Sequence, residues 1–105
     1  MIKKASLEDV DQMKTLIDFY ASKNRMLARS LSYLYEHIRQ YFVSKEGDLV
    51  LGCAALHITW KNLGEVKSLA VDPRYISKGI GKDLLSACIK EAKDMGLPEV
   101  FTLTL

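Results

Sequence analysis

Two glycines, Gly79 and Gly81, stand where an apolar, strand-like stretch gives way to a helical pattern, with Lys78 and Lys82 beside them. The start of a helix carries unpaired N–H groups and the positive end of the helix dipole. Glycine lets an anion approach the backbone without a Cβ in the way. Residues 77–82 therefore predict a cradle for a pyrophosphate group. A loop that only turns a strand into a helix is the alternative.

Two common nucleotide-binding motifs place glycines in similar loops, and neither fits this one. A P-loop requires G-x-x-x-x-G-K-[ST], but Ile76 stands at the first glycine position and Asp83 follows Lys82. A dinucleotide fingerprint requires G-x-G-x-x-G/A, but Leu84 occupies its third position. Both motifs are therefore rejected.

The elements around this loop follow from the spacing of apolar residues. A capping box at Ser6 and Asp9 begins the first helix, and Ser30 caps a second one. That second helix is expected to carry four apolar residues on one side, namely Leu31, Leu34, Tyr35 and Ile38. The expected strands are residues 1–5, 39–45, 49–60, 65–72 and 99–105, and the other helices are 7–22 and 79–96.

The order of these elements, β-α-α-β-β-β-α-β, predicts an α/β (α+β) fold with a mixed sheet. Three consecutive strands joined by hairpins should be antiparallel. The crossover through helix 79–96 should place the last strand parallel to strand 65–72, by a right-handed connection. In strand 65–72 the side chains should alternate, with Glu65, Lys67, Leu69 and Val71 on one face and Val66, Ser68, Ala70 and Asp72 on the other.

The composition is typical of one small water-soluble domain. The 105 residues carry a net charge of +2, with basic residues spread among acidic ones, which argues against a nucleic-acid binder. No apolar run approaches the roughly 18 residues that span a bilayer, and the acidic residues at 8, 9 and 11 argue against a signal peptide. We therefore expect a single domain over residues 1–105, in the cytoplasm, with no membrane or nucleic-acid partner.

Cysteine and histidine do not form a metal-binding pattern. Cys53 and Cys88 each stand among apolar residues, which predicts buried, reduced thiols; a disulfide or a catalytic thiol is the alternative. His37 and His57 lack ligand spacing to each other and to the cysteines. No metal site is therefore expected, and His57 and Trp60 are expected to pack in the core or at a strand edge.

The segment of residues 68–105 closely resembles the acetyl-CoA-binding segment of the GNAT superfamily of N-acetyltransferases. That superfamily carries [QR]-x-x-G-x-[GA] after a V-x-P strand end. The residues that match are Val71, Pro73, Gly79 and Gly81. One departure is Ile76, where Gln or Arg is usual, which removes a side chain near the phosphates but leaves the backbone N–H groups. The resemblance extends to the element order, and it implies acetyl-CoA as the co-substrate.

The resemblance also implies roles for backbone groups. In this superfamily the strand before the loop splays from its neighbour and binds the pantetheine arm, which by position falls to Leu69, Ala70 and Val71. One freed N–H, that of Leu69 or Ala70 with Leu69 preferred, would stabilise the oxyanion of the thioester. The pyrophosphate would be held by the loop amides of Ile76, Ser77, Lys78, Gly79, Ile80, Gly81 and Lys82.

A closer resemblance is to the acetyltransferase domain of N-acetylglutamate synthases, which acetylate glutamate at the start of arginine biosynthesis. It is carried by RSLSYLYEHIRQYFV, GCAALHITWKNLGEVKSLAVDP and VFTLTL. It implies that the acceptor is the α-amine of an amino acid, with L-glutamate expected. Glu65 is then the nearest acid to act as a base through water. Arg29 and Lys67 are the expected clamps for the acceptor carboxylates, and plain surface charge is the alternative for all three residues.

Three functions stay open: an amino-acid N-acetyltransferase, the same fold acting on another amine or on a protein, and a non-catalytic acyl-CoA-binding module. By the resemblance, family members continue with another helix and a strand pair, which we expect this chain to lack. A homo-oligomer or an exposed apolar edge would follow. The tyrosine that protonates the leaving thiolate in many members would lie beyond residue 105. The tyrosines at positions 33, 35, 41 and 75 carry no functional signal.

Overall fold

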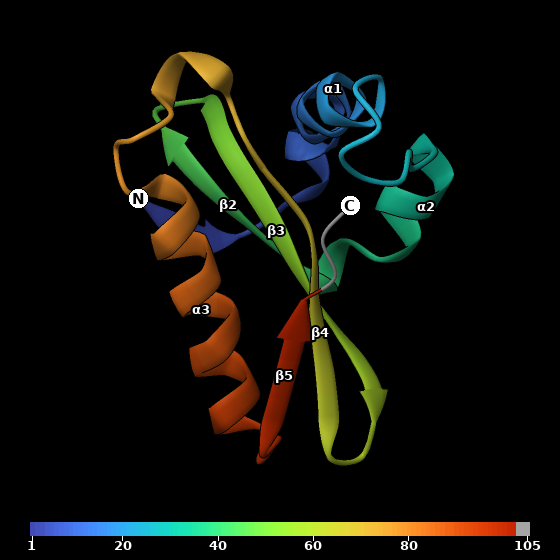
Figure 1. Ribbon diagram of the computed structural model, residues 1–105. Coiled ribbons are helices and arrows are strands. Elements are labelled where there is room, and N and C mark those ends of the chain that lie inside the picture. Colours follow the sequence, from blue (N-terminus) through green and yellow to red (C-terminus); the bar gives the residue numbers. More distant parts are fainter. Residues whose placement is uncertain (103–105) are drawn as a thin grey trace.

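The protein, described here over residues 1–102 by a computed structural model, is built on one five-stranded sheet in the order β1-β2-β3-β4-β5. The helix α3 covers one face of the sheet, and α1 and α2 cover the other (Figure 1). Among these residues there is no helix with the length and apolar content that a membrane span needs. The strands are β1 (Ile2–Lys4), β2 (Tyr41–Glu46), β3 (Leu49–Trp60), β4 (Leu63–Val71) and β5 (Glu99–Thr102). The helices are α1 (Val10–Ala21), α2 (Leu31–Glu36) and α3 (Ile80–Asp94), with 3₁₀ turns at Leu7–Asp9, Ile38–Gln40 and Pro73–Tyr75.

The strand pairing confirms the predicted mixed sheet. Strands β1 to β4 are antiparallel in chain order, and β4 and β5 are parallel, joined through α3. The parallel pair runs from Leu63 opposite Glu99 to Val66 opposite Thr102. Within residues 1–102, the second half of β4 therefore has no strand partner on its β5 side.

Each face of the sheet has its own hydrophobic core, because β3 and β4 bury side chains on both sides. The core under α1 and α2 consists of Val10, Met13, Leu16, Ile17, Leu34, Tyr41, Val43, Val50, Cys53, Ala55 and Ala70. The core under α3 consists of Leu51, Ala54, Leu56, Val66, Ile80, Leu84, Cys88, Ala92 and Leu97.

Asp9 fixes the start of α1 and also forms a buried ion pair. The Ser6 N–H donates to Asp9 Oδ2 at 2.9 Å, as the predicted capping box requires. Asp9 is only 1% exposed, and Lys45 Nζ of β2 donates to its Oδ1 at 2.7 Å. Burial alone would raise the pKa of Asp9, but the hydrogen bonds from Lys45 and Ser6 outweigh burial, so the pKa lies below its ordinary value. The pair ties the first helix to the second strand.

Replacing Asp9 by Asn is expected to lower the free energy of unfolding by about 2 kcal/mol at neutral pH, because a charge-assisted hydrogen bond to Lys45 is lost. The folded-state pKa of Asp9 is depressed, so its contribution is present above about pH 4 and is lost as the pH falls through the folded-state pKa. The stabilities of wild type and variant, measured by urea unfolding, should therefore converge as the pH falls below about 4 and through the folded-state pKa. Asp18→Asn, which breaks the exposed Lys14–Asp18 pair, is the control and should change little. A difference that stays constant over this pH range would contradict the assignment.

The segment after Ser30 is less helical than its apolar spacing predicts. Ser30 caps α2 as predicted, since the Tyr33 N–H donates to its Oγ at 3.0 Å. Of the apolar residues expected on one side of this helix, only Leu34 is fully buried. The helix ends before Ile38 because His37 leaves the helical conformation, with φ −109° and ψ 15°. The predicted apolar side is therefore wrong for two residues that are exposed instead, Leu31 and Tyr35.

The middle of β4 carries a β-bulge that simple alternation does not reveal. Two residues of β4, Ser68 and Leu69, lie opposite a single residue of β3, Ala54. Ser68 adopts a φ of +56°, which is rare for a residue with a side chain. Val66 packs in the core under α3, whereas Ala70 packs in the core under α1 and α2. The prediction that Val66 and Ala70 share one face is therefore wrong, because the bulge adds one residue between them.

Candidate functional site

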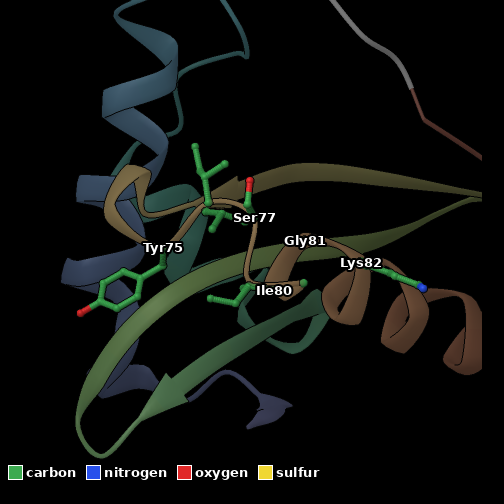
Figure 2. A pocket seen from close by; sticks show the side chains of 8 residues that line it. Tyr75, Ser77, Ile80, Gly81 and Lys82 are labelled. Carbon is green, nitrogen blue, oxygen red and sulfur yellow. The ribbon is translucent and has the colours of Figure 1, made fainter.

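A pocket of about 290 Å³ opens where the chain passes from β4 into α3 (Figure 2). The loop before α3 and the first turn of this helix provide most of its wall. The first N–H groups of a helix have no partner within the helix, so the pocket lies beside free backbone donors. The residues that line it are Val71, Tyr75, Ile76, Ser77, Gly79, Ile80, Gly81 and Lys82.

The loop takes its shape from Asp72 and from two residues in the left-handed conformation. Asp72 is buried and accepts hydrogen bonds from the Arg74 N–H at 2.9 Å and from the Arg74 guanidinium at 2.8 Å. The hydrogen bonds from Arg74 hold the pKa of Asp72 below its ordinary value. Ser77 (φ +71°) and Gly79 (φ +81°) then turn the chain into α3. Gly79, the N-cap residue of α3, takes this conformation without the strain a Cβ would cause.

The glycine at position 81 has no folding requirement of its own. A Cβ at Gly81 would meet only Val71 Cγ2, at 3.7 Å, which is an ordinary contact. Glycine inside a helix destabilises by about 0.5–1 kcal/mol relative to alanine. The missing side chain therefore keeps the pocket open rather than improving the packing, as a close approach of an anion to the backbone requires.

The pocket brings together most of the residues that the sequence predicts for the coenzyme, but three do not line it. Leu69 and Ala70 lie in β4, immediately before the lining residue Val71, and Lys78 is exposed in the loop. Lys82 lines the pocket, but its side chain extends along α3, away from the middle of the loop (Figure 2). Tyr75 lines the pocket although no sequence signal indicated it, because its position depends on the 3₁₀ turn that Asp72 caps.

Val71 links the pocket to the opposite face of the sheet. Its carbonyl oxygen accepts a hydrogen bond from the Tyr20 hydroxyl, at 2.5 Å. Tyr20 belongs to the last turn of α1. The end of β4 is thus held by the helix that leads into the loop of residues 22–30.

A second group of residues gathers on the face that α2 covers. The guanidinium carbon of Arg29, from the loop before α2, lies 4.6 Å from the ring centroid of Tyr33. Lys67 Nζ, from β4, lies 5.7 Å from the centroid of the same ring. Tyr33 also stacks on His37, with 4.0 Å between the ring centroids. The two predicted cations therefore approach one aromatic ring, an arrangement that can receive an anionic ligand.

Glu65 and His57 adjoin this group as directly paired residues of β4 and β3. Burial first, and then the positive charge of Lys67, lower the pKa of His57, and the Glu65 carboxylate offsets this only in part. The imidazole is therefore neutral at pH 7. Among residues 1–102, His57 Nδ1 and Arg29 Nε are buried without a hydrogen-bond partner. A packing role alone for His57 does not account for this polar setting.

Tyr33 is the main residue of this group that sequence analysis missed. The four-residue spacing from Arg29 to Tyr33 is only a weak signal, because Arg29 precedes the N-cap Ser30 and lies outside the helix. The approach of Lys67 has no local signal, since it comes from a strand much later in the chain.

The two cysteines are free, buried thiols, as predicted. Burial raises the pKa of Cys53 to about 12 and that of Cys88 to about 11. Neither is therefore a thiolate at neutral pH, which rules out a ready nucleophile. Within the part of the chain that the structure describes, no group of His, Cys, Asp and Glu side chains is arranged to hold a metal ion.

Comparison with known proteins identifies the family of the chain. The family model described as Acetyltransferase (GNAT) family matches residues 7–105. The amino-acid acetyltransferase of Mycobacterium tuberculosis is 38% identical over 107 residues, covering 99% of this chain and 61% of that protein. An uncharacterized N-acetyltransferase of Chlorobaculum tepidum is 36% identical over 104 residues, covering 99% of this chain and 67% of that protein.

Solved structures show the same fold. A Mycobacterium tuberculosis protein in complex with CoA and a second ligand superposes with a TM-score of 0.94 at 38% identity, over 100% of this chain and 64% of that one. N-acetylglutamate synthase from Neisseria gonorrhoeae, complexed with coenzyme A and N-acetyl-glutamate, superposes with a TM-score of 0.95 at 30% identity, over 99% of this chain and 25% of that one. The chain thus spans less than two thirds of the Mycobacterium tuberculosis and Neisseria gonorrhoeae proteins. Because the family model covers nearly all of its residues, the chain belongs to the GNAT family of acetyltransferases.

Proposed function

We propose that this protein transfers an acetyl group from acetyl-CoA to the α-amine of an amino acid, with L-glutamate as the expected acceptor. The observation that carries the proposal is the course of β4. Its first half presents Glu65 and Lys67 to the cluster around Tyr33, and its end leads into the pocket at the start of α3. One strand thus connects a site for an anionic amine with a site for a diphosphate.

Backbone groups would bind the coenzyme. Amides of residues 76–82 would hold the pyrophosphate, and the backbone of residues 69–71 would bind the pantetheine arm. Leu69 is the preferred donor to the thioester oxygen. This preference is supported by the strand pairing, because Ala70 lies opposite Cys53 of β3 whereas Leu69 lies in the bulge. A bulged residue is left out of the regular ladder, so the amide of Leu69 is the better candidate for the coenzyme.

The acceptor would bind by its carboxylates. Arg29 Nε is buried without a partner among residues 1–102, and such a donor is costly unless a ligand satisfies it. A carboxylate between Arg29 and Lys67 would supply the missing acceptor and neutralise two charges that flank one ring. This supports a dicarboxylic amino acid over a neutral amine.

The transfer needs one proton removed before attack and one after it. A water held by Glu65 would take a proton from the acceptor ammonium, which leaves a free amine. The amine nitrogen then bonds to the thioester carbon, and the Leu69 N–H stabilises the negative carbonyl oxygen. As the C–S bond breaks, CoA leaves as a thiolate, the nitrogen loses its second proton, and one proton neutralises the thiolate.

Thiol release from acetyl-CoA, measured with and without L-glutamate on the purified chain, tests the proposal. Release that depends on L-glutamate and is much weaker with L-glutamine would support it, because glutamine lacks the side-chain carboxylate. Release with other amines only would mean that the acceptor is different. Binding of acetyl-CoA without release in any case would mean a non-catalytic acyl-CoA-binding module.

Replacing Arg29 by Ala is expected to raise the KM for L-glutamate by about 10- to 100-fold, the value of one charge-assisted hydrogen bond. The affinity for acetyl-CoA should stay unchanged, since Arg29 lies outside the pocket. Steady-state kinetics at varied glutamate gives both values. Arg25→Ala is the matched control, because Arg25 is an exposed arginine of the same loop. An unchanged KM in Arg29→Ala would remove this residue from the acceptor site.

A further inference from the structure

We propose that Tyr41 and Cys53 are positioning residues that hold the bulge of β4 in the geometry that acetyl transfer needs. The inference rests on the proposed function, because it concerns the backbone groups assigned to the thioester. It adds two side chains, Tyr41 from β2 and Cys53 from β3, neither of which lines the pocket.

The bulge depends on one residue in an unfavourable conformation. Ser68 adopts the left-handed region at φ +56°, where a Cβ crowds the backbone. Such a conformation persists only where surrounding groups hold it. The residue that follows, Leu69, carries the amide assigned to the oxyanion. A change of backbone angles at Ser68 would therefore redirect that amide.

Two side chains contact Ser68 from the β2–β3 side of the sheet. The Tyr41 hydroxyl donates to Ser68 Oγ at 3.2 Å, and the Cys53 thiol donates to the Ser68 carbonyl oxygen at 3.5 Å. Tyr41 and Cys53 are 0% exposed, and Ser68 is 8% exposed. Burial raises the pKa of Tyr41 to about 12, so its hydroxyl remains a donor at neutral pH. The hydroxyl and the carbonyl oxygen of Ser68 are thus each held by a side chain that water does not reach.

Within the described residues, the bulge of β4 is restrained only from its β2–β3 side. β5 pairs with β4 up to Val66, so no strand pairs with the bulge from the β5 edge within residues 1–102. Within the described residues, the β2–β3 contacts are therefore the ones that restrain Ser68 and the peptide group that follows it. Misplacing a catalytic group by about 1 Å can reduce a rate by about 100-fold, so even a small relaxation of Ser68 should affect turnover.

Tyr41→Phe tests the inference, because it keeps the buried ring and removes only the hydroxyl. We expect kcat to fall by about 10-fold or more, with acetyl-CoA affinity within about twofold of wild type, since the pocket keeps its Asp72-capped loop. Cys88→Ala is the control for a general loss of core packing, because Cys88 lies in the core under α3; its kcat should stay at the wild-type value. A kcat of Tyr41→Phe equal to that of Cys88→Ala would overturn the inference.

A double-mutant cycle separates the hydrogen bond from other effects. If Tyr41 acts through Ser68 Oγ, Ser68→Ala and Tyr41→Phe each reduce kcat, and the double variant is no slower than the slower single variant. Multiplicative losses of kcat would mean that the two residues act independently, and would overturn the proposal that Tyr41 holds the bulge through Ser68. Ser68→Ala also carries the test if Tyr41→Phe does not fold.

The experiment distinguishes failure of the inference from failure of the proposed function. If the wild-type chain releases no thiol with any amine, the proposed function fails. Hydrogen exchange then tests directly whether Tyr41 holds the bulge of β4. The Ala70 amide should exchange about 10-fold faster or more in Tyr41→Phe, while the Val66 amide, before the bulge, keeps its wild-type rate. An unchanged exchange rate at Ala70 would overturn the inference that Tyr41 holds the bulge, whatever the protein catalyses.

Discussion

An aspartate at position 81 is expected to weaken acetyl-CoA binding by about a hundredfold or more, equivalent to about 2.7 kcal/mol, and to leave the fold intact. The Gly81→Asp side chain would enter the pocket and bring a negative charge to the place proposed for the pyrophosphate. The fold should tolerate it, because a Cβ has 3.7 Å of room to Val71 and an acidic residue is favourable in the first turn of a helix. Calorimetric titration gives the affinity, and thermal unfolding without ligand gives the stability.

Two further variants separate space from charge at this position. Gly81→Ala adds only a methyl group, so it should raise the melting temperature slightly, through helix propensity, and weaken binding less than the aspartate does. Ser86→Ala, at an exposed position of α3, should leave binding unchanged. If Gly81→Asp binds acetyl-CoA like wild type, the pyrophosphate does not lie at this helix N-terminus.

Replacing Glu65 by Gln is expected to reduce kcat with L-glutamate by about 100- to 1,000-fold at neutral pH, the usual contribution of a general base. The amide keeps the size and part of the hydrogen bonding of the carboxylate but cannot take a proton. The deficit should shrink as the pH rises, because the acceptor amine is then increasingly neutral before it binds. The measurement is kcat as a function of pH for both proteins.

The control for Glu65→Gln is Glu99→Gln, which removes the same charge from an exposed position on the neighbouring strand β5. It should leave kcat unchanged across the pH range. A deficit of Glu65→Gln that is equally large at high pH would show that the carboxylate does something other than accept the proton. An unchanged kcat at neutral pH would exclude Glu65 as the base.

The shape of the loop before α3 could be predicted from the sequence because its requirements are local. The left-handed Gly79, the open position at Gly81 and the start of α3 lie within a few residues of one another. The same holds for the capping groups of α1 and α2, which hydrogen-bond within three residues. Each of these features is decided by backbone conformation and short-range hydrogen bonds, which the residue types reveal.

The cluster around Tyr33 could be predicted only in part, because long-range packing brings it together. Arg29 and Lys67 are predicted from their charge, but Tyr33, the ring that both approach, has an ordinary sequence environment. The bulge was missed for a related reason. Ser68 fits a regular alternation as well as an irregular one, and its conformation depends on partners in β2 and β3.

The bulge determines which face of the sheet each later residue of β4 presents. If the two residues that face Ala54 instead took regular positions in the pleat, every position after them would exchange faces. Ala70 would then turn towards α3, and Val71 would leave the wall of the pocket, although no side chain had changed its chemistry. We therefore expect substitutions in this strand to be tolerated far better than an insertion into it.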